Sequence, residues 1–430
     1  MKRRTFIKKT ATGTAGIAMP AYLTSFAKER RLRIGVIGTG WFGLLLGELA
    51  IGTGKAEIVA VCDVDNERLK GSTEKLEQLQ GARPATFRDY WDMLDMKELE
   101  AVFIATPTHW HALQFIDACH KGLDIYCEKP LSYDIMEGLA MVRAAQKAGN
   151  IVQIGFMRLQ GEPYQYVRQL IEEGKAGNIN QIVAQIHFRA NPGDTTIQDP
   201  PESLDWDLWC GPAPKLPYSR GAHYSWRQQK VYGNGHMVDW GIHHIHTARK
   251  IMEDVIAEKY TATGGVYFLK NRITAPDTLT ANISFKKVPL IWQHRMWGAG
   301  DMNPELNDGI FFHGDKASIF VSDNRVMVRP ANEDAELTDR IFGDRMDVIM
   351  DMIKLHVDEF ITASLLRDPS TISCPIQDAY SSTTTVHLAA MAYETGSTVK
   401  WDNQRSTIIN NSQAEALMKR QYRDGWKHPG

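Results

Sequence analysis

The chain has 430 residues, of which 43% are hydrophobic and 23% charged, and its formal net charge is -2. This composition is that of a globular protein and excludes disordered and fibrous classes. The near-zero charge excludes the strongly basic surface that nucleic-acid-binding proteins use. The length predicts two domains.

The first residues are basic and then mildly apolar. Arg3 and Arg4 precede Phe6-Ile7-Lys8, and a Gly-, Ala- and Thr-rich stretch leads to Ser25-Phe26-Ala27, which fits a peptidase site. Residues 1–27 resemble a twin-arginine signal peptide, which implies a protein exported already folded, to the periplasm or an equivalent compartment. The alternative is an uncleaved basic amphipathic N-terminus. No later stretch has the roughly 18 uninterrupted apolar residues of a membrane span, so we expect no membrane anchoring after the signal is removed.

Between residues 33 and 156, short apolar runs alternate with helical patterns. Runs so rich in Val, Ile and Ala are typical of strands covered by helices on both faces. Such strands are expected at residues 33–38, 57–63, 101–107, 124–129 and 151–156. We predict an α/β domain over residues 28–157, a doubly wound parallel sheet of the Rossmann type.

The first of these strands runs directly into Gly38-Thr39-Gly40-Trp41-Phe42-Gly43 and then into an apolar helix. In this context Gly38 permits a tight turn, Gly40 lets a pyrophosphate approach the backbone, and Gly43 lets helix and strand pack closely. Asp63 ends the second strand, where a carboxylate accepts from a ribose 2′-hydroxyl. Because that carboxylate repels a 2′-phosphate, the pattern predicts NAD as the cofactor in preference to NADP.

Three further motifs carry a family resemblance. They are Ala105-Thr106-Pro107-Thr108-His109-Trp110-His111, Cys127-Glu128-Lys129-Pro130, and the run from Gly233 to His243, which contains Asp239. With the glycine motif they resemble the Gfo/Idh/MocA family of NAD(P)-dependent oxidoreductases, which act mostly on sugars and cyclitols. The resemblance implies that Thr106, Pro107, His109, His111, Glu128 and Lys129 help to hold the cofactor, as do Trp41 and Phe42 beside the glycines. It also implies a cis bond between Lys129 and Pro130.

From about residue 158 the pattern changes to strands with short turns. Strands are expected at residues 181–190, 260–268, 279–285, 290–297, 309–321 and 325–329, and helices that close the domain at 345–364 and 379–394. We predict that residues 158–430 form a substrate-binding and oligomerisation α+β domain with an open, mainly antiparallel sheet. The family resemblance implies that one face of this sheet binds partner subunits, so a homo-oligomer is expected.

Asp239 and His243 are four residues apart in a run with helical spacing, which predicts that they share one helix face. Oxidising a secondary alcohol requires a base near the hydroxyl, and an imidazole oriented by a carboxylate suits that role. Lys129, at the carboxyl end of a strand, would polarise the substrate oxygen. The catalytic roles of Lys129, Asp239 and His243 are those that the family resemblance implies.

Other polar residues flank the predicted cleft. His109, Tyr224, Arg227 and Tyr232 are expected to contact the substrate together with Lys129 and His243. Trp206 and Trp209 are either an aromatic platform for a sugar or residues that pack the domains together.

A metal site is not expected. The histidines gather at His223, His236, His243, His244 and His246, but no His-Glu-x-x-His element accompanies them. The five cysteines have neither paired nor metal-type spacing.

Two functions remain open. The first is a sugar or cyclitol oxidoreductase with a tightly bound nicotinamide cofactor. The second is an NAD-dependent glycosidase that oxidises a ring hydroxyl transiently, eliminates the aglycone, adds water and restores the hydroxyl. The Asp239 and His243 element favours the oxidoreductase, because those glycosidases are known for a Tyr-x-x-His element instead.

Overall fold

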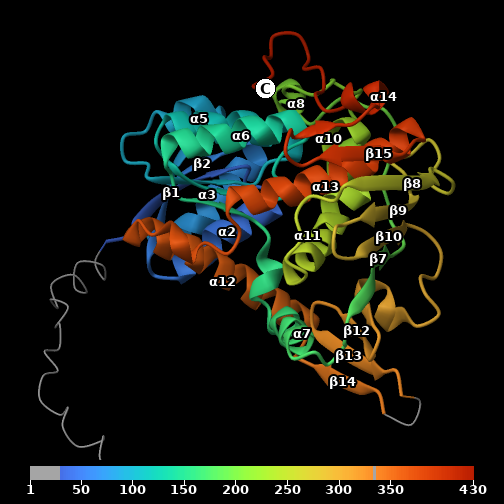
Figure 1. Ribbon diagram of the computed structural model, residues 1–430. Coiled ribbons are helices and arrows are strands. Elements are labelled where there is room, and N and C mark those ends of the chain that lie inside the picture. Colours follow the sequence, from blue (N-terminus) through green and yellow to red (C-terminus); the bar gives the residue numbers. More distant parts are fainter. Residues whose placement is uncertain (1–29, 333–335) are drawn as a thin grey trace, which may run out of the picture.

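The computed structural model describes residues 30–332 and 336–430. The expected signal peptide lies outside these residues. Two sheets stand side by side, each with its own helices (Figure 1). None of the described helices is long and apolar enough to cross a membrane.

The first sheet is fully parallel, with the strand order β3-β2-β1-β4-β5-β6. This is the doubly wound order in which ligands bind beyond the carboxyl ends of the strands. The strands are β1 (Leu32–Ile37), β2 (Ala56–Cys62), β3 (Ala85–Phe87), β4 (Ala101–Ile104), β5 (Asp124–Cys127) and β6 (Val152–Ile154). The prediction of this sheet is confirmed, and only the short, mostly exposed β3 had no counterpart in it.

Helices cover both faces of the first sheet. They are α2 (Trp41–Gly52), α3 (Asn66–Gln80), α4 (Tyr90–Leu94), α5 (His111–His120) and α6 (Ile135–Ala148). Helix α6 shows why these boundaries are readable from the sequence. The carboxylate of Asp134 accepts from the N–H of Glu137 at 2.7 Å, and Gly149 ends the helix with φ +69°.

The second sheet has ten strands in the order β14-β13-β12-β11-β7-β10-β9-β8-β15-β16. Among the described strands of this sheet only β7 and β10 pair in parallel, so the sheet is mainly antiparallel, as predicted. Its strands are β7 (Ile179–His187), β8 (Lys259–Gly265), β9 (Thr278–Ser284), β10 (Pro289–Arg295), β11 (Asp308–Gly314), β12 (Ala317–Val321), β13 (Arg325–Pro330), β14 (Thr338–Ile341), β15 (Val399–Asp402) and β16 (Thr407–Ile408). The single strand expected at 309–321 is wrong, because Asp315 and Lys316 form a turn that separates β11 from β12.

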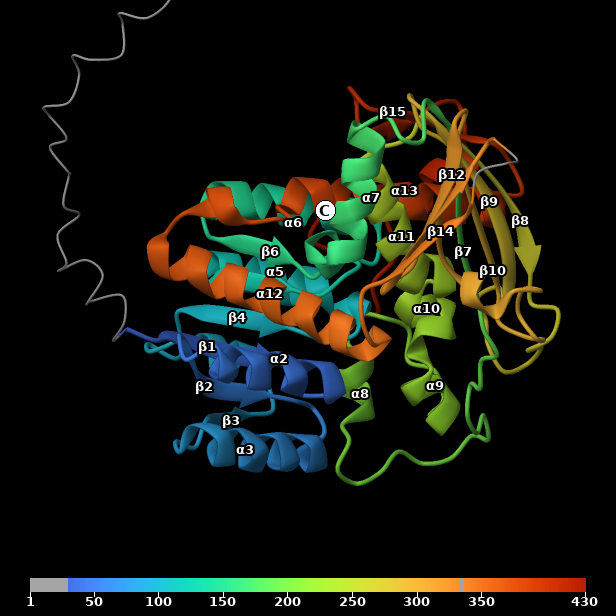
Figure 2. The ribbon, with the colours of Figure 1, turned by 90° about the horizontal axis from the view of Figure 1, so that it is seen from below.

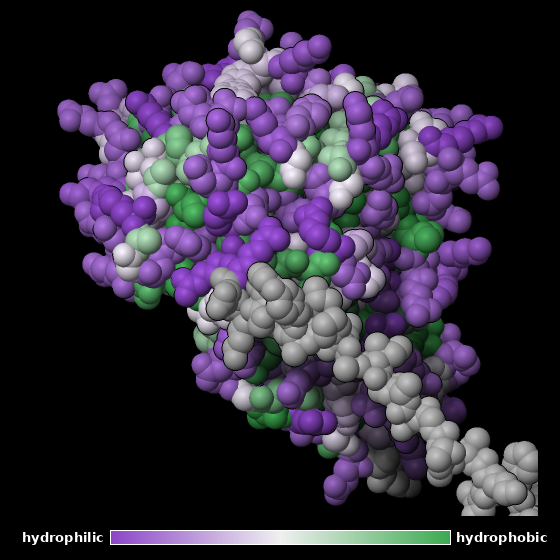
Figure 3. Space-filling model, turned by 90° about the vertical axis from the view of Figure 1, so that its left-hand side faces the viewer, coloured by the Kyte–Doolittle hydropathy of each residue, from purple (hydrophilic) through white to green (hydrophobic). Residues whose placement is uncertain are grey.

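The remaining helices fill the space between the sheets and the ends of the second one. They are α7 (Glu162–Glu172), α8 (Trp206–Cys210), α9 (Arg220–Tyr224), α10 (Lys230–Gly233), α11 (Ile242–Ile251), α12 (Arg345–Leu366), α13 (Ile376–Thr395) and α14 (Ser412–Glu415). The side of the molecule in Figure 3 is mostly hydrophilic, with small separate hydrophobic areas, because the large apolar side chains pack inside.

We expected helix α12 to close the second domain, but it crosses to the first domain (Figure 2). Phe360 packs against Phe103 and Tyr126 of the first sheet, with ring centroids 5.8 and 5.9 Å apart. Val357 and Phe360 are fully buried there. A helix from the second half of the chain therefore completes the core of the first domain.

A buried ion network holds the first turn of α12. Asp323 bonds Arg158 Nε at 2.7 Å, Arg345 Nη2 at 2.9 Å and the Tyr164 hydroxyl at 2.9 Å. Arg345 also pairs with Asp308, which bonds His244 Nε2 at 2.7 Å. Burial raises the pKa of Asp323, but the Arg158 guanidinium outweighs it and holds the pKa well below its usual value.

Asp323→Asn is expected to lower the free energy of unfolding by about 3 to 5 kcal/mol, because it leaves the buried Arg158 charge without its partner. Equilibrium unfolding in denaturant measures this loss. Glu172→Gln, which breaks the exposed Arg168 and Glu172 pair on α7, is the matched control and should cost a small fraction of that. Equal losses in the two variants would contradict the assignment of the network as a buried support of α12.

Candidate active site

One cavity of about 520 Å³ lies between the two domains, at the carboxyl ends of the first sheet's strands. Both domains line it. Predicted site residues at its wall are Gly38, Gly40, Trp41, Phe42, Asp63, Thr106, Pro107, Glu128, Lys129, Tyr224, Arg227, Asp239 and His243. The structure thus brings together residues that lie up to 205 positions apart in the chain.

In the glycine turn at one end of the cavity, Gly38 and Gly43 have no room for a side chain. Gly38 has φ +85°, which favours glycine, and a β-carbon on Gly43 would lie 1.9 Å from the Gly38 carbonyl oxygen. Helix α2 begins at once after Gly40 without a side-chain cap, so its first N–H groups face the cavity end unpaired by a capping side chain. These features fit a pyrophosphate, which binds at such a helix start.

Asp63 is held at the end of β2 by the backbone. Its Oδ2 accepts from the Thr39 N–H at 2.8 Å, and its Oδ1 accepts from the Asp65 N–H at 3.0 Å. Burial raises the pKa of this carboxyl, and the two backbone bonds act in the opposite direction. Oδ2 also accepts from the Thr39 hydroxyl at 3.2 Å, so Oδ1 is the oxygen that keeps a lone pair and can accept from a ribose hydroxyl.

Lys129 and Asp239 form the charged centre of the site. Lys129 Nζ donates to Asp239 Oδ1 at 2.9 Å and to the Asp239 carbonyl oxygen at 2.8 Å. Arg227 Nε lies 3.0 Å from Oδ2 in an ion pair that falls outside hydrogen-bond geometry. Burial raises the pKa of Asp239, but the charges of Lys129 and Arg227 prevail, and the pKa falls below 3.8. The carboxylate is therefore ionised and fixes the ammonium of Lys129.

His243 lines the same cavity with only 5% of its surface exposed. Neither ring nitrogen has a hydrogen-bond partner among the described residues. Burial, and after it the charges of Arg158 and Lys129, hold the pKa of His243 well below 6.5. The imidazole is neutral at physiological pH and has a free nitrogen for a proton.

The sequence spacing suggested that Asp239 orients His243. In the structure Asp239 orients Lys129 instead. The physical reason lies in the backbone. Residues Met237–Gly241 form one π-helical turn before α11 starts at Ile242, and such a turn changes the angular spacing of residues four apart. The Lys129–Pro130 peptide that precedes the site is cis, as the family resemblance implied.

Glu128 lies buried beside Lys129, with its Oε2 accepting from the Lys129 N–H at 3.2 Å. A β-carbon on Gly155 would lie 2.3 Å from Glu128 Oε1, so the side chain packs directly on that glycine. Burial raises the pKa of Glu128 from 4.5 to about 7, although the Lys129 charge acts against it.

This pKa makes stability depend on pH. The folded protein favours the protonated form of Glu128. The protonated carboxyl therefore contributes to the stability of the fold below about pH 4.5, and this contribution is lost as the pH rises towards 7. The loss is on the order of 3 kcal/mol. Glu128→Gln, which cannot ionise, should therefore gain stability over the cofactor-free wild type between pH 5 and pH 8, measured by denaturant unfolding. A stability difference that stays constant over this range would show that Glu128 does not titrate there.

Four of the predicted site residues do not line the cavity. They are Gly43, His109, His111 and Tyr232. Gly43 packs on the glycine turn, as described above. His109 Nε2 lies 2.9 Å from the Trp209 carbonyl oxygen, and both nitrogens of His111 lie 2.9 Å from the carbonyl oxygens of Thr106 and Pro130. The Tyr232 hydroxyl accepts from the Leu216 N–H at 3.1 Å. These three side chains support the loops around the site.

Several cavity residues were not predicted, among them Arg68, Trp240, Met346 and Ile353. Met346 and Ile353 come from α12, which we expected to close the second domain. Trp240 follows Asp239 directly, and Lys129 Nζ lies 6.0 Å from its ring centroid. Its place in the motif was the one available signal.

A cluster with metal-type donors lies elsewhere, at Asp134, Glu137 and His428. Asp134 accepts from His428 Nε2 at 3.0 Å, and Glu137 accepts from Arg420 Nε at 2.9 Å. The Arg420 guanidinium already neutralises these carboxylates, so the cluster is an anchor for the C-terminal segment. Within residues 30–332 and 336–430, the histidines near the cavity do not form such a cluster.

Two family descriptions match the chain. Residues 32–156 match "Oxidoreductase family, NAD-binding Rossmann fold", and residues 168–401 match "Oxidoreductase family, C-terminal alpha/beta domain". The Rossmann match agrees with the glycine turn and with Asp63, and it makes NAD the cofactor that fits this end of the cavity.

Curated relatives resemble part of the chain. Inositol 2-dehydrogenase of Salmonella typhimurium is 31% identical over 162 residues, which are 37% of this chain and 47% of the relative. The enzyme of that name from Corynebacterium glutamicum strain R is 32% identical over 172 residues, which are 40% and 49% of the two chains. The chain thus spans about half the length of the curated relatives it matches.

Solved structures share the fold over most of the chain. A levoglucosan dehydrogenase in complex with NADH and levoglucosan has a TM-score of 0.67 at 18% identity, over 86% of this chain and 99% of its own. Myo-inositol 2-dehydrogenase from Lactobacillus plantarum has a TM-score of 0.65 at 18% identity, with the same coverage.

Proposed function

Since the chain belongs to the Gfo/Idh/MocA oxidoreductase family, matched over residues 32–156 and 168–401, we propose that it interconverts a hydroxyl and a carbonyl of a sugar or cyclitol with NAD. The observation that carries this proposal is the fixed ammonium of Lys129 beside the neutral imidazole of His243 in the interdomain cavity. When bound, NAD supplies the acceptor for the hydride that leaves the carbinol carbon.

Lys129, His243 and Asp239 have different roles in this reaction. Lys129, bonded twice to Asp239, keeps a third N–H for the substrate oxygen and stabilises negative charge that develops on it. His243 takes the hydroxyl proton on its free nitrogen and returns it in the reverse direction. Asp239 stays ionised and acts on the substrate through Lys129.

The substrate class rests on the size and lining of the cavity and on the relatives. Lys129 offers a donor near the exposed ring of Trp240, and Arg227 offers donors in the same cavity; sugar hydroxyls bind to such donors next to an aromatic surface. The named relatives act on inositol, and one structural neighbour holds levoglucosan.

We propose export through the twin-arginine pathway, for which residues 1–27 are the support. An exported enzyme of this kind would carry its NAD and restore its redox state within its own cycle.

The test is turnover by the purified full chain with NAD and single carbohydrates, starting with myo-inositol and levoglucosan. Appearance of NADH absorbance with one of them, and its absence without carbohydrate, is the expected result. A nitrophenyl glycoside tests the glycosidase alternative, because release of nitrophenol with no net NADH would replace the proposed reaction by that one.

A further inference from the structure

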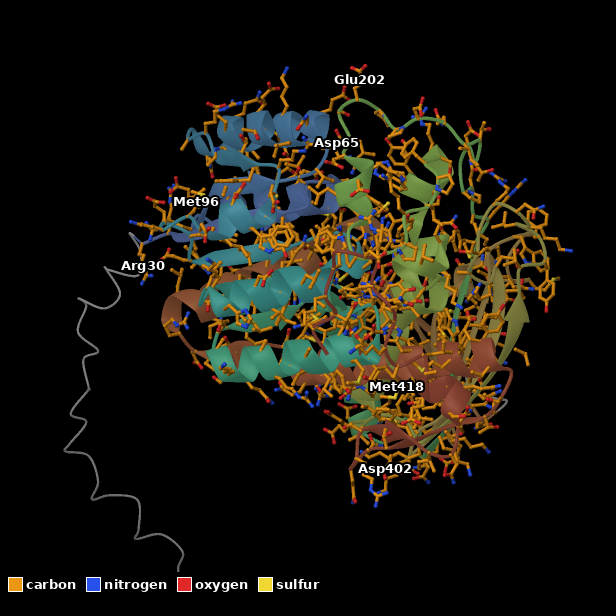
Figure 4. All side chains as sticks on the ribbon, turned by 90° about the horizontal axis from the view of Figure 1, so that it is seen from above. Arg30, Asp65, Met96, Glu202, Asp402 and Met418 are labelled. Atoms are coloured by element: carbon orange, nitrogen blue, oxygen red, sulfur yellow. The ribbon has the colours of Figure 1, made fainter. Side chains whose placement is uncertain are left out.

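A segment of the second domain reaches across to the carboxyl end of β2 and pairs with it. The Asn66 N–H donates to the Ser203 carbonyl at 2.9 Å, and the Asp205 N–H donates to the Val64 carbonyl at 3.0 Å. Leu204 bridges to Asp65 between these bonds. Figure 4 shows Glu202 on this segment close to Asp65. We refer to residues 201–224, which include α8 and α9, as the strap.

The strap is also fixed further along. The Trp110 indole Nε1 donates to the Trp209 carbonyl at 2.9 Å, and His109 Nε2 lies at the same distance from that oxygen. Trp209 stacks on Trp206, with ring centroids 4.6 Å apart and planes 16° apart. Burial lowers the pKa of His109 to about 3, so the ring is neutral and Nε2 can carry the proton that it donates. The strap is therefore an ordered wall of the cavity.

Tyr224 lies at the far end of the strap and is 58% exposed. It lines the cavity, and the Arg68 guanidinium carbon lies 5.7 Å from its ring centroid. Arg68 Nε lies 3.5 Å from Asp65 Oδ2. A β-carbon on Gly40 would lie 3.1 Å from Arg68 Nη1. Tyr224 thus lies beside the end of β2 and the glycine turn, whereas Asp239 and Lys129 mark the reacting end.

In a doubly wound sheet the end of β2 receives the ribose and adenine of a bound dinucleotide. We propose that the strap closes the adenosine half of the cofactor site and that the Tyr224 ring covers the adenine, so that the dinucleotide stays bound between turnovers. This inference rests on the proposed NAD-dependent function. Tyr224, which we expected to contact the substrate, is thereby assigned to the cofactor. An aromatic ring beside a guanidinium suits the flat face of a purine.

The experiment measures the release of NADH in the absence of any carbohydrate. The full chain is loaded with NADH, excess NAD is added, and the loss of bound NADH fluorescence gives the dissociation rate. Tyr224→Ala is expected to raise this rate about tenfold, within the range of a lost aromatic and cation–π contact. Tyr224→Phe, which keeps the ring, should restore the wild-type rate to within about twofold.

Tyr267→Ala is the matched control, because Tyr267 is 60% exposed on the second domain and lies outside the cavity lining. It should leave the rate unchanged. An unchanged rate in Tyr224→Ala would overturn the inference and leave the proposed function standing. A wild-type chain that binds no NADH would overturn both, and a faster release in Tyr224→Phe equal to that of Tyr224→Ala would assign the effect to the hydroxyl and contradict the role of the ring.

Discussion

Lys129→Met is expected to lower the turnover rate by about 100- to 1,000-fold, the loss typical of removing one donor to a developing oxyanion. Methionine is unbranched and nearly as long as lysine but carries no charge and no N–H. The turnover number with NAD and whichever of the tested carbohydrates the wild type converts measures the loss. Binding of NADH, followed by fluorescence, should weaken far less than the turnover rate falls, because the glycine turn and Asp63 hold the cofactor at the other end of the cavity.

Two results would contradict this role of Lys129. One is a turnover rate within a few-fold of the wild type. The other is an equal loss in Lys230→Met, the matched control, since Lys230 pairs with Glu394 on the surface and lies outside the cavity lining. Lys129→Met also leaves the buried Asp239 carboxylate with Arg227 alone, so its folded state must be checked by circular dichroism before the rates are compared.

His243→Gln is expected to lower the turnover rate by about 100- to 10,000-fold, the range of general acid–base catalysis. Glutamine fills much of the space of the imidazole but cannot accept the proton at neutral pH. Because burial and the charges of Arg158 and Lys129 hold the pKa of His243 well below 6.5, the wild type should not lose rate through protonation of His243 between pH 8 and pH 6.5. The pH profile of turnover measures this.

The matched control for His243 is His246→Gln on the same helix. His246 is buried, stacks on Phe156 at 4.2 Å and bonds Ser382 Oγ at 2.9 Å, and it does not line the cavity. This variant should lose stability and keep its turnover rate to within a few-fold. If the two variants lose rate equally, His243 acts through packing and not as the base.

The first domain was predictable because each of its signals is local. A strand, the glycines at 38, 40 and 43, and an acid at the next strand end stand within 32 residues, and the backbone conformation of Gly38 explains why that position is glycine. Lys129, Asp239 and His243 came from motifs, and the cavity gathers all three.

The parts that escaped prediction depend on contacts between distant segments. The apolar stripe of α12 is the same whether it packs on its own sheet or on the first one, so the pairing of Phe360 with Phe103 and Tyr126 has no local signal. The strap pairs through backbone groups of Ser203 and Asp205, which any sequence offers. The π-helical turn at Met237–Gly241 changed the partner of Asp239, and no spacing rule for a regular helix could predict that.

Hydride transfer between the substrate carbon and NAD is tested most directly by a hydrogen-transfer experiment on the full chain. Loaded with NAD, the protein is mixed with myo-inositol, and in parallel with levoglucosan, carrying deuterium at the carbinol carbons, and the nicotinamide C4 is examined by mass spectrometry or NMR. We expect deuterium at C4 in the wild type with at least one of the two and far slower labelling in Lys129→Met. A wild-type chain that binds NAD and leaves C4 unlabelled with both would contradict this expectation.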